Sequence, residues 1–524
     1  MRNDKLSAAS GTVSRLAAQG CGEGKRAATP PSAAGPIPRA RMLVSVLALS
    51  LAACTAGPEF VRPTPAVPAQ FAQAATLEDS APGLGAAADA VSAPDTEFWR
   101  GFDDPLLTRL VEEALLSNHD LRMALTRIDR ANALLRGARL ERLPSVTATA
   151  GAGETRASAD QLPGFAREAR DGDSFEAAVV AGWELDLFGR LRRQVEAQGA
   201  DARASAADLH ALQVAIVGEV TRGYAELRGL QERLRVAREN AENQRETLRL
   251  VEARLDAGRG AEFDRSRARA QLETTLSRVP GLQAQVATTM HRLAVLSGRM
   301  PGELVAQLEA PRPLPALPAL LDPGAPGALL RRRPDVLAAE HRLHAANARI
   351  GIASADLFPR FTLGGLIGSH AVDRGALFGR DSETRLLALG VDWSFLDIGR
   401  VRARIAAADA DAEGALARYQ QTVLFALEDT ENALVRYARA RAEDAHLQRA
   451  ASDSARAAQL ARIRFEAGAA DLFEVLEAER TRLQAQDALA AGRTRSLTGA
   501  VAVYQALAGG WPGSVPLRES LGAR

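Results

Sequence analysis

The sequence predicts a membrane α+β protein made of two copies of one helix-and-strand unit, and three observations support this fold class. A motif that begins with tryptophan and ends with Gly-Arg occurs at Trp183–Arg190 and again 210 positions later at Trp393–Arg400. Long proline-free stretches consist mainly of Ala, Arg, Glu, Leu and Gln, which are strong helix formers. Each copy also contains segments in which apolar and polar residues alternate with the period of a β-strand.

The repeat continues on both sides of these motifs. Downstream, Arg254–Gly258 is matched by Arg464–Gly468 at the same spacing of 210. Upstream, Leu143-Pro144 matches Phe358-Pro359 at a spacing of 215, so the five-residue difference falls between the prolines and the tryptophans. A constant spacing over the helical part, with the difference confined to one segment, indicates a duplication.

Each unit is expected to begin with a helix and to contain one very long helix. The first helix should run from Pro105 to about Leu140, with proline in its first turn, and its counterpart after Pro334 should be shorter. Residues 190–256 contain no proline, and a helix of that length would reach roughly 100 Å. It must therefore pack lengthwise on partner helices, as in a coiled coil. A glycine turn and a fourth helix complete each unit.

Four segments are candidate β-strands. Alternation is regular in 175–185 and 387–395, and it is weaker in 145–151 and 361–368. On alternation alone, an amphipathic sheet in a soluble domain would be the better explanation.

Membrane geometry changes this interpretation. After Cys54, no apolar stretch approaches the roughly 20 residues of a transmembrane helix, so any crossing must use strands. Four strands cannot close a barrel in lipid, where the smallest familiar barrel has about eight. An open edge would leave backbone groups unpaired in hydrocarbon at several kcal/mol each, so several chains must share one barrel. Two chains would supply eight strands and three would supply twelve, and this argument does not choose between them.

The N-terminal region has the pattern of a bacterial lipoprotein signal. Arg39 and Arg41 precede an apolar run at 42–51, and a Leu-Ala-Ala-Cys sequence ends at Cys54. This order resembles a lipobox, so Cys54 is expected to be acylated, with 1–53 removed as a signal peptide preceded by an unusual extension. The alternative is a buried N-terminal segment with an incidental cysteine. Without the first 53 residues the chain carries 58 basic and 62 acidic side chains, which gives no reason to expect nucleic acid as a partner.

Five further motifs resemble the TolC superfamily, and more closely its lipoprotein branch of the NodT or OprM type. They occur in the family's order and span nearly the whole mature chain: Gly57–Pro63, Phe98–Leu106 with Asn118–Leu121, Arg332–Val336 with Ala339-Glu340, Ile350-Gly351 with Phe358-Pro359, and Ala426–Leu434.

The resemblance implies a trimeric TolC-like channel, in which three chains share a 12-stranded outer-membrane barrel above a long periplasmic α-helical barrel. It also implies a lipid-anchored location in the outer membrane. The expected segments are a signal peptide with its extension at 1–53, a lipidated N-terminal and equatorial segment at 54–104, a first repeat at 105–299, a Pro-rich equatorial linker at 300–333, a second repeat at 334–508 and a C-terminal tail at 509–524.

By the same resemblance, the Gly258 and Gly468 turns lie at the periplasmic tip, where a periplasmic adaptor protein would dock. Arg254 and Arg464 each lie four residues before these glycines, where a cation complements the helix dipole, and they are expected to contact the adaptor.

The resemblance also implies a pore constriction after the second turn, at Phe473, Glu474 and Glu477. Arg267 in the first repeat lies 210 positions before Glu477, and we expect it to pair with that carboxylate. The alternative is that both glutamates belong to a solvated helix face.

The implied function is the exit channel of a tripartite, RND-type efflux pump that works with an adaptor and an inner-membrane transporter. Two alternatives are a lipid-anchored periplasmic coiled-coil scaffold without a pore and an exit duct for type I secretion. An enzyme is not expected, because the seven histidines are scattered and only His341 and His344 share a helical face. No cofactor or metal is expected, and the exported substrate is not indicated.

Overall fold

The computed structural model describes residues 55–72, 97–317, 323–509 and 511. The chain divides into two units, 1–53 and 54–524. The predicted signal peptide and Cys54 lie outside the described residues, and the fold below is that of the second unit.

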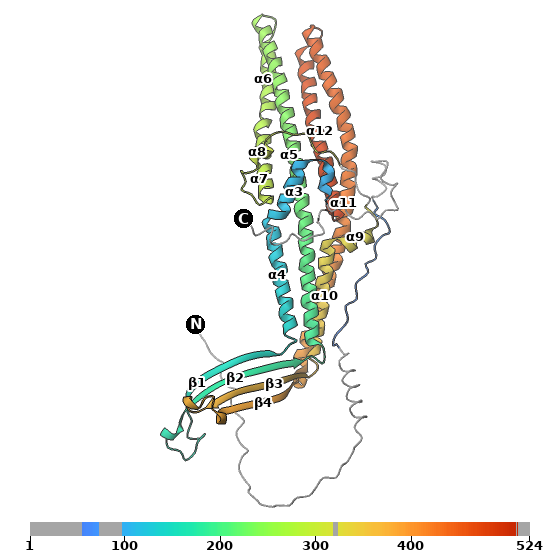
Figure 1. The fold of residues 1–524 in the computed structure, drawn as a ribbon. Helices are drawn as coiled ribbons and strands as arrows, with labels where there is room; N and C mark the ends of the chain where they lie inside the picture. Colours follow the sequence, from blue (N-terminus) through green and yellow to red (C-terminus); the bar gives the residue numbers. More distant parts are fainter. Residues whose placement is uncertain (1–54, 73–96, 318–322, 510, 512–524) are drawn as a thin grey trace, which may run out of the picture. The chain divides into compact units, whose positions relative to one another are not determined.

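Two long helical hairpins dominate this unit (Figure 1). The first joins α5 (Arg190–Asp256) to α6 (Glu262–Leu276) and α7 (Arg278–Leu296), and the second joins α11 (Ile398–Glu466) to α12 (Leu472–Ala506). The predicted helix over 190–256 is confirmed. The two hairpins pack together chiefly through α5 and α12. No helix in the described part of the chain is both long and apolar enough to cross a membrane.

Shorter helices flank the hairpins. They are α3 (Pro105–Ser117), α4 (His119–Leu140), α8 (Val305–Leu308), α9 (Pro326–Arg332) and α10 (Pro334–Ala355). Helix α4 packs on α5, and α10 packs on both α5 and α11. Helix α10 is the expected shorter counterpart of the first helix.

The single helix expected from Pro105 to Leu140 is wrong, because the chain breaks at Asn118. This residue has extended backbone angles, and its Oδ1 accepts hydrogen bonds from the backbone N–H groups that open α4, at 2.8 and 3.2 Å. Its Nδ2 donates to the carbonyl of Leu296, 2.9 Å away. Asn118 is therefore a buried N-cap that also fastens α4 to the end of α7.

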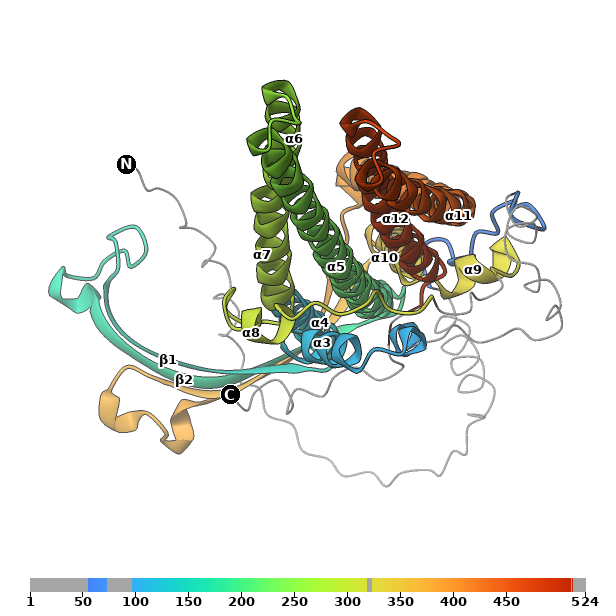
Figure 2. The ribbon, with the colours of Figure 1, turned by 90° about the horizontal axis from the view of Figure 1, so that it is seen from above.

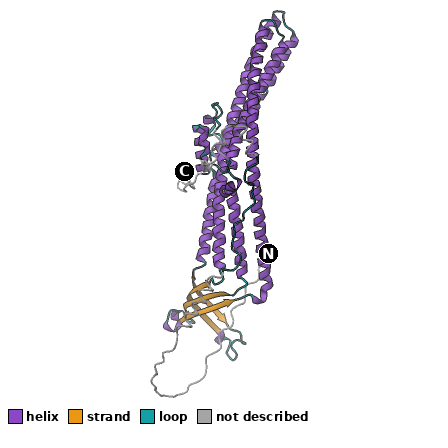
Figure 3. Cartoon of the chain, turned by 90° about the vertical axis from the view of Figure 1, so that its right-hand side faces the viewer, coloured by secondary structure: helices purple, strands orange, loops and turns teal. Residues whose placement is uncertain are grey.

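The four predicted strands form one antiparallel sheet in the order β1-β2-β3-β4 (Figure 3). The strands are β1 (Ser145–Arg156), β2 (Asp171–Leu185), β3 (Arg360–Ala371) and β4 (Glu383–Asp392). Figure 2 shows that the sheet is curved along its strands. Strand β4 ends before the predicted boundary, because Phe395 begins a short 3₁₀ turn that leads into α11.

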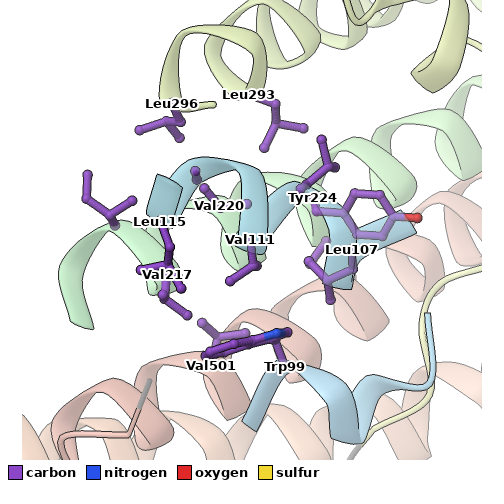
Figure 4. Packing of buried hydrophobic residues seen from close by; sticks show 14 of the residues in the cluster. Trp99, Leu107, Val111, Leu115, Val217, Val220, Tyr224, Leu293, Leu296 and Val501 are labelled. Atoms are coloured by element: carbon purple, nitrogen blue, oxygen red, sulfur yellow. The ribbon is translucent and has the colours of Figure 1, made fainter. Parts of the chain in front are cut away.

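The largest apolar cluster lies where the helices of both repeats meet (Figure 4). Trp99, from a 3₁₀ turn at Phe98–Phe102, packs there with side chains of α3, α5, α7 and α12. At its edge, the Tyr224 hydroxyl donates to Asp104 Oδ2 at 2.6 Å, while Asp104 Oδ1 caps α3. Burial and the bond to Asp104 raise the pKa of Tyr224 to about 12.

The segment after Cys54 lies on the junction between sheet and helices. The backbone N–H of Ala56 donates to the carbonyl of Phe188 at 2.9 Å, and Phe60 stacks on His344 with ring centroids 4.3 Å apart. His344 also contacts Glu196 at 2.8 Å, so its ring holds the N-terminal segment to α5 and α10. Among the described residues, no group of three potential metal ligands occurs.

Candidate functional site at the hairpin turns

The two hairpin turns have the same backbone structure. At the first, Gly258 has φ 70°, and the N–H of Arg259 donates to the Arg254 carbonyl at 2.8 Å. At the second, Gly468 has φ 74°, and the N–H of Ala469 donates to the Arg464 carbonyl at 2.8 Å. This is a Schellman ending, and it explains the glycines, because other residues rarely adopt positive φ.

Arg254 connects the two hairpins. Its Nη2 donates to the backbone carbonyl of Phe465 at 3.0 Å, and its guanidinium carbon lies 3.9 Å from the centre of the Phe465 ring. Phe465 belongs to α11 and is buried. Arg254 is therefore half-buried and engaged in a structural contact, rather than free at the turn.

Arg464, the repeat equivalent of Arg254, stays within its own hairpin. Its Nη2 donates to the Ala469 carbonyl at 3.2 Å, and its Nη1 lies 3.5 Å from Glu474 Oε2. The side chains of both Arg464 and Glu474 are largely exposed. The two arginines therefore occupy equivalent turn positions but have different surroundings.

The structure does not join Arg267 to Glu477 within the chain, so this expectation is wrong for a single protomer. Glu477 Oε1 lies 2.6 Å from Arg480 Nη2, three residues along the same helix. The Arg267 guanidinium instead lies 4.8 Å from the centre of the Phe473 ring and 5.5 Å from that of Phe263. A neighbouring cation on the same helix is available to Glu477 in any arrangement of the hairpins, whereas the two exposed rings attract Arg267.

An apolar cluster supports both turns. It contains Val251, Ala268, Phe465, Leu472, Val475 and Leu476, which come from α5, α6, α11 and α12. Helix α12 is capped above it, since the N–H of Glu474 donates to Asp471 Oδ1 at 2.9 Å. The turns therefore form one packed tip with Phe473, Glu474 and Glu477 on its surface.

A second duplicated feature lies at the other end of the helices. Trp183 Nε1 donates to the Arg142 carbonyl at 3.0 Å, and Trp393 Nε1 donates to the Leu357 carbonyl at 3.1 Å. Each bond joins the end of a strand to the chain just before the preceding strand. These two bonds were not predicted from the sequence. The repeat does relate them, because the two tryptophan donors are 210 positions apart and the two carbonyl acceptors are 215 positions apart.

The sheet has one mainly apolar face. Residues paired across the sheet, such as Trp183 with Leu363 and Leu363 with Leu389, share a face. The apolar face contains Val146, Ala148, Ala150, Phe175, Val179, Trp183, Phe361, Leu363, Ile367, Leu387, Leu389 and Val391. The opposite face contains Thr147, Thr149, Glu176, Gly182, Glu184, Thr362, Gly364 and Thr384, together with Val180, Leu366 and Leu386.

Apart from the end of β3, where Ser369 and Ala371 are buried, the described part of the chain leaves the sheet largely uncovered. Every residue of β1 is exposed, and nearly all of β4 is exposed as well. Leu387 on the apolar face is 79% exposed and Ile367 is 70% exposed. Such a surface is far more apolar than solvent-facing sheets usually are, so it indicates a covering environment.

Comparison with known proteins agrees with this geometry. A family model described as "Outer membrane efflux protein" matches residues 110–299 and 325–509, which together are well over half of the chain. The chain belongs to the outer membrane efflux protein family. The two matched stretches overlap the two predicted repeats, and the second begins within the predicted linker at 300–333.

Several curated members of the outer membrane efflux protein family are similar over most of their length. Outer membrane protein OprJ of Pseudomonas aeruginosa is 32% identical over 477 residues, which cover 89% of this chain and 95% of OprJ. Pyoverdine export outer membrane protein OpmQ of Pseudomonas putida is 34% identical over 444 residues, or 82% of this chain and 92% of OpmQ. Nodulation protein T of Rhizobium leguminosarum bv. trifolii is 28% identical over 459 residues, or 86% of this chain and 93% of that protein.

Solved structures of the same family have the same fold. The outer-membrane channel OprN superposes with a TM-score of 0.80 at 40% identity, covering 87% of this chain and all of that one. The open state of the Neisseria gonorrhoeae MtrE outer membrane channel gives a TM-score of 0.75 at 25% identity, covering 88% of this chain and all of that one. The fold class predicted from the sequence, a TolC-like trimeric channel, is confirmed.

Proposed function

We propose that three copies of this chain form the outer-membrane exit channel of a tripartite, RND-type efflux pump. The observation that carries the proposal is the four-stranded sheet, which is mainly apolar on one face, mainly polar on the other and largely uncovered by the described residues. A periplasmic scaffold without a pore would have no use for such a sheet.

The edges of the sheet support assembly. Among the described residues of one chain, β1 pairs only with β2 and β4 pairs only with β3, so each outer strand has one edge without a described partner. In hydrocarbon each unpaired backbone group would cost several kcal/mol. If β4 of one chain pairs with β1 of the next, three chains close a ring of twelve strands. The apolar face then contacts lipid, and the face with threonine, glycine and glutamate lines a water-filled channel.

The N-terminus fits a lipid anchor at this junction. Ala56 binds the backbone at Phe188, between the end of β2 and the start of α5. The Cβ that alanine would have at Gly189 would lie 2.6 Å from Thr55 Cγ2, so the segment approaches that turn closely. An acyl chain on Cys54 would therefore begin beside the periplasmic end of the strands. If palmitate labelling persisted in Cys54→Ser, the anchor would have to be elsewhere.

We assign the tip to adaptor binding and to the narrowest part of the pore. In a trimer, Glu474 and Glu477 supply two rings of three carboxylates, and Phe473 adds an apolar ring. The Gly258 and Gly468 turns would face a periplasmic adaptor, and that adaptor would connect them to the inner-membrane transporter. The relatives are named for different cargoes, such as pyoverdine and toluene, and we assign none to this chain.

Reconstitution of the purified, lipidated protein in planar bilayers tests the proposal. We expect a cation-selective conductance from a threefold oligomer, and we expect the gene to restore drug resistance in a strain that lacks its own exit channel. A protein that is monomeric in detergent and silent in bilayers would favour the scaffold.

A further inference from the structure

The interface between the two hairpins contains a buried polar layer. Near the middle of the chain's helical part, α5 and α12 meet through the large apolar cluster, and at the tip they meet through the smaller one. Between these clusters, Asn240 Nδ2 donates to Gln486 Oε1 at 3.0 Å, and Thr247 Oγ1 lies 3.1 Å from Glu479 Oε1. The two contacts are seven residues apart on both antiparallel helices, so they lie on the same face of the interface.

The hydroxyl of Thr247 lies between two oxygen atoms but carries only one proton. Its Oγ1 is 3.1 Å from the backbone carbonyl of Asn243 and 3.1 Å from Glu479 Oε1. The carbonyl can only accept, so if Thr247 donates to it, Glu479 must donate to Thr247. Both hydrogen bonds therefore form together only when the Glu479 carboxyl is protonated.

The surroundings of Glu479 disfavour its anion. The residue is 3% exposed, and its Oε2 has no hydrogen-bond partner in the described chain. The charged groups facing it are Glu246 on α5, Arg462 on α11 and Arg482 on its own helix. Arg462 pairs with Glu246 at 3.1 Å, and Arg482 donates to Asn240 Oδ1 at 3.0 Å, so both cations are engaged elsewhere. Burial raises the pKa of Glu479 above its usual range and outweighs the lowering effects of the Thr247 hydroxyl and the two arginines.

Gln244, another buried polar residue of this layer, adds no hydrogen bond between the two helices in the described chain. Gln244 lies one turn before Thr247 on α5 and is 2% exposed. Neither polar atom of its side-chain amide has a partner among the described residues. An unpaired buried amide weakens the packing of the interface, so the bond through Glu479 matters more to its stability.

We propose that Glu479 is a proton-binding site that fastens the two hairpins to each other, and that loss of its proton favours their separation. A raised acid pKa means that the stabilisation is present at low pH and is lost as pH rises through the folded-state pKa. The effect on conduction rests on the proposed channel function, whereas the proton site itself is a property of the folded chain.

Infrared spectroscopy of the purified full-length oligomer tests the proton directly. We expect a protonated-carboxyl C=O band that persists as pH rises above the range in which exposed carboxyls titrate, and that disappears in Glu479→Gln. The matched control Glu273→Gln, at an exposed position on α6, should leave the band unchanged. A wild-type spectrum in which no carboxyl band outlasts those of the exposed carboxyls as pH rises would overturn the proposal. If Glu479→Gln fails to assemble, Thr247→Val replaces it, and an unshifted band in that variant would overturn the proposal equally.

The pH dependence of the tip tests the consequence. By linkage, the equilibrium between packed and separated hairpins should shift by up to tenfold per chain for each pH unit between the pKa of Glu479 in the separated hairpins and its higher pKa in the packed ones. Amide hydrogen exchange itself becomes faster as pH rises. In the wild-type protein, exchange at 240–250 and 476–486 should therefore accelerate with pH by more than this intrinsic effect, whereas in Glu479→Gln it should follow the intrinsic effect alone. Equal pH dependence in both proteins would refute the fastening role. Because exchange is measured without transport, a failed efflux assay would count against the channel function and not against this site.

Discussion

Arg254 and Arg464 occupy equivalent positions in the two repeats, yet the structure predicts that their removal has unequal effects. In Arg254→Ala the chain loses a charge-assisted hydrogen bond to the Phe465 carbonyl and a guanidinium–ring contact at 3.9 Å. Such a bond contributes about 1.5–3 kcal/mol, and the ring contact about 0.5–1 kcal/mol at a partly exposed site. Allowing for partial exposure, we expect a loss of about 2 kcal/mol in the contact between hairpins, a change of about 30-fold in local opening.

Arg464→Ala is the matched control. Its contacts, to Ala469 and Glu474, lie within one hairpin and are largely exposed, so the expected loss is below about 1 kcal/mol. Hydrogen exchange of peptides that cover 460–470 should accelerate about 30-fold in Arg254→Ala and less than about fivefold in Arg464→Ala. Similar acceleration in the two variants would refute the argument that Arg254 joins the hairpins. If both exchange as wild type but efflux is lost, the arginines serve the adaptor as the sequence suggests.

Three further predictions concern the tip and the core. Replacing Gly258 or Gly468 by alanine should destabilise the hairpin by about 1 kcal/mol, because φ stays positive while open space surrounds the new methyl group; an unchanged melting curve would contradict the turn assignment. The double replacement Glu474→Ala with Glu477→Ala should reduce cation selectivity in planar bilayers. Arg267→Ala should raise the conductance, because it removes the cation that contacts the Phe473 ring. Stable oligomers with unaltered selectivity and conductance would place the constriction elsewhere. Asn118→Ala should destabilise the chain by about 2 kcal/mol in urea unfolding, because it leaves the start of α4 and the Leu296 carbonyl without partners, whereas Asn118→Asp should restore only the cap.

The regular parts of the fold were predictable from local sequence. Helix α5 has the predicted bounds because its composition favours helix along its whole length and a glycine stands at each end. The break at Asn118 was missed because its decisive partner, the Leu296 carbonyl, is 178 positions away. A local pattern of helix-forming residues carries no information about such a contact.

The candidate site was predictable only in outline. The glycine turns follow from the repeat, and the structure gives them the required positive φ. The partner of Arg267 could not be deduced, because charge spacing does not reveal whether a carboxylate or an aromatic ring is nearer once the hairpins pack. The proton shared by Thr247 and Glu479 also depends on a contact between residues 232 positions apart. Neither residue stands out in the sequence, because Thr247 and Glu479 lie in different helices, α5 and α12, with nothing in either local pattern to connect them.

Electron cryomicroscopy of the lipidated protein, purified from outer membranes into lipid nanodiscs, tests the central claim most directly. The account predicts a threefold particle in which β4 of each chain pairs with β1 of the next, with Leu387 and Ile367 facing lipid and Thr147 and Glu184 facing the channel. A monomer or dimer, or a sheet whose apolar face is covered by helices instead of lipid, would contradict it.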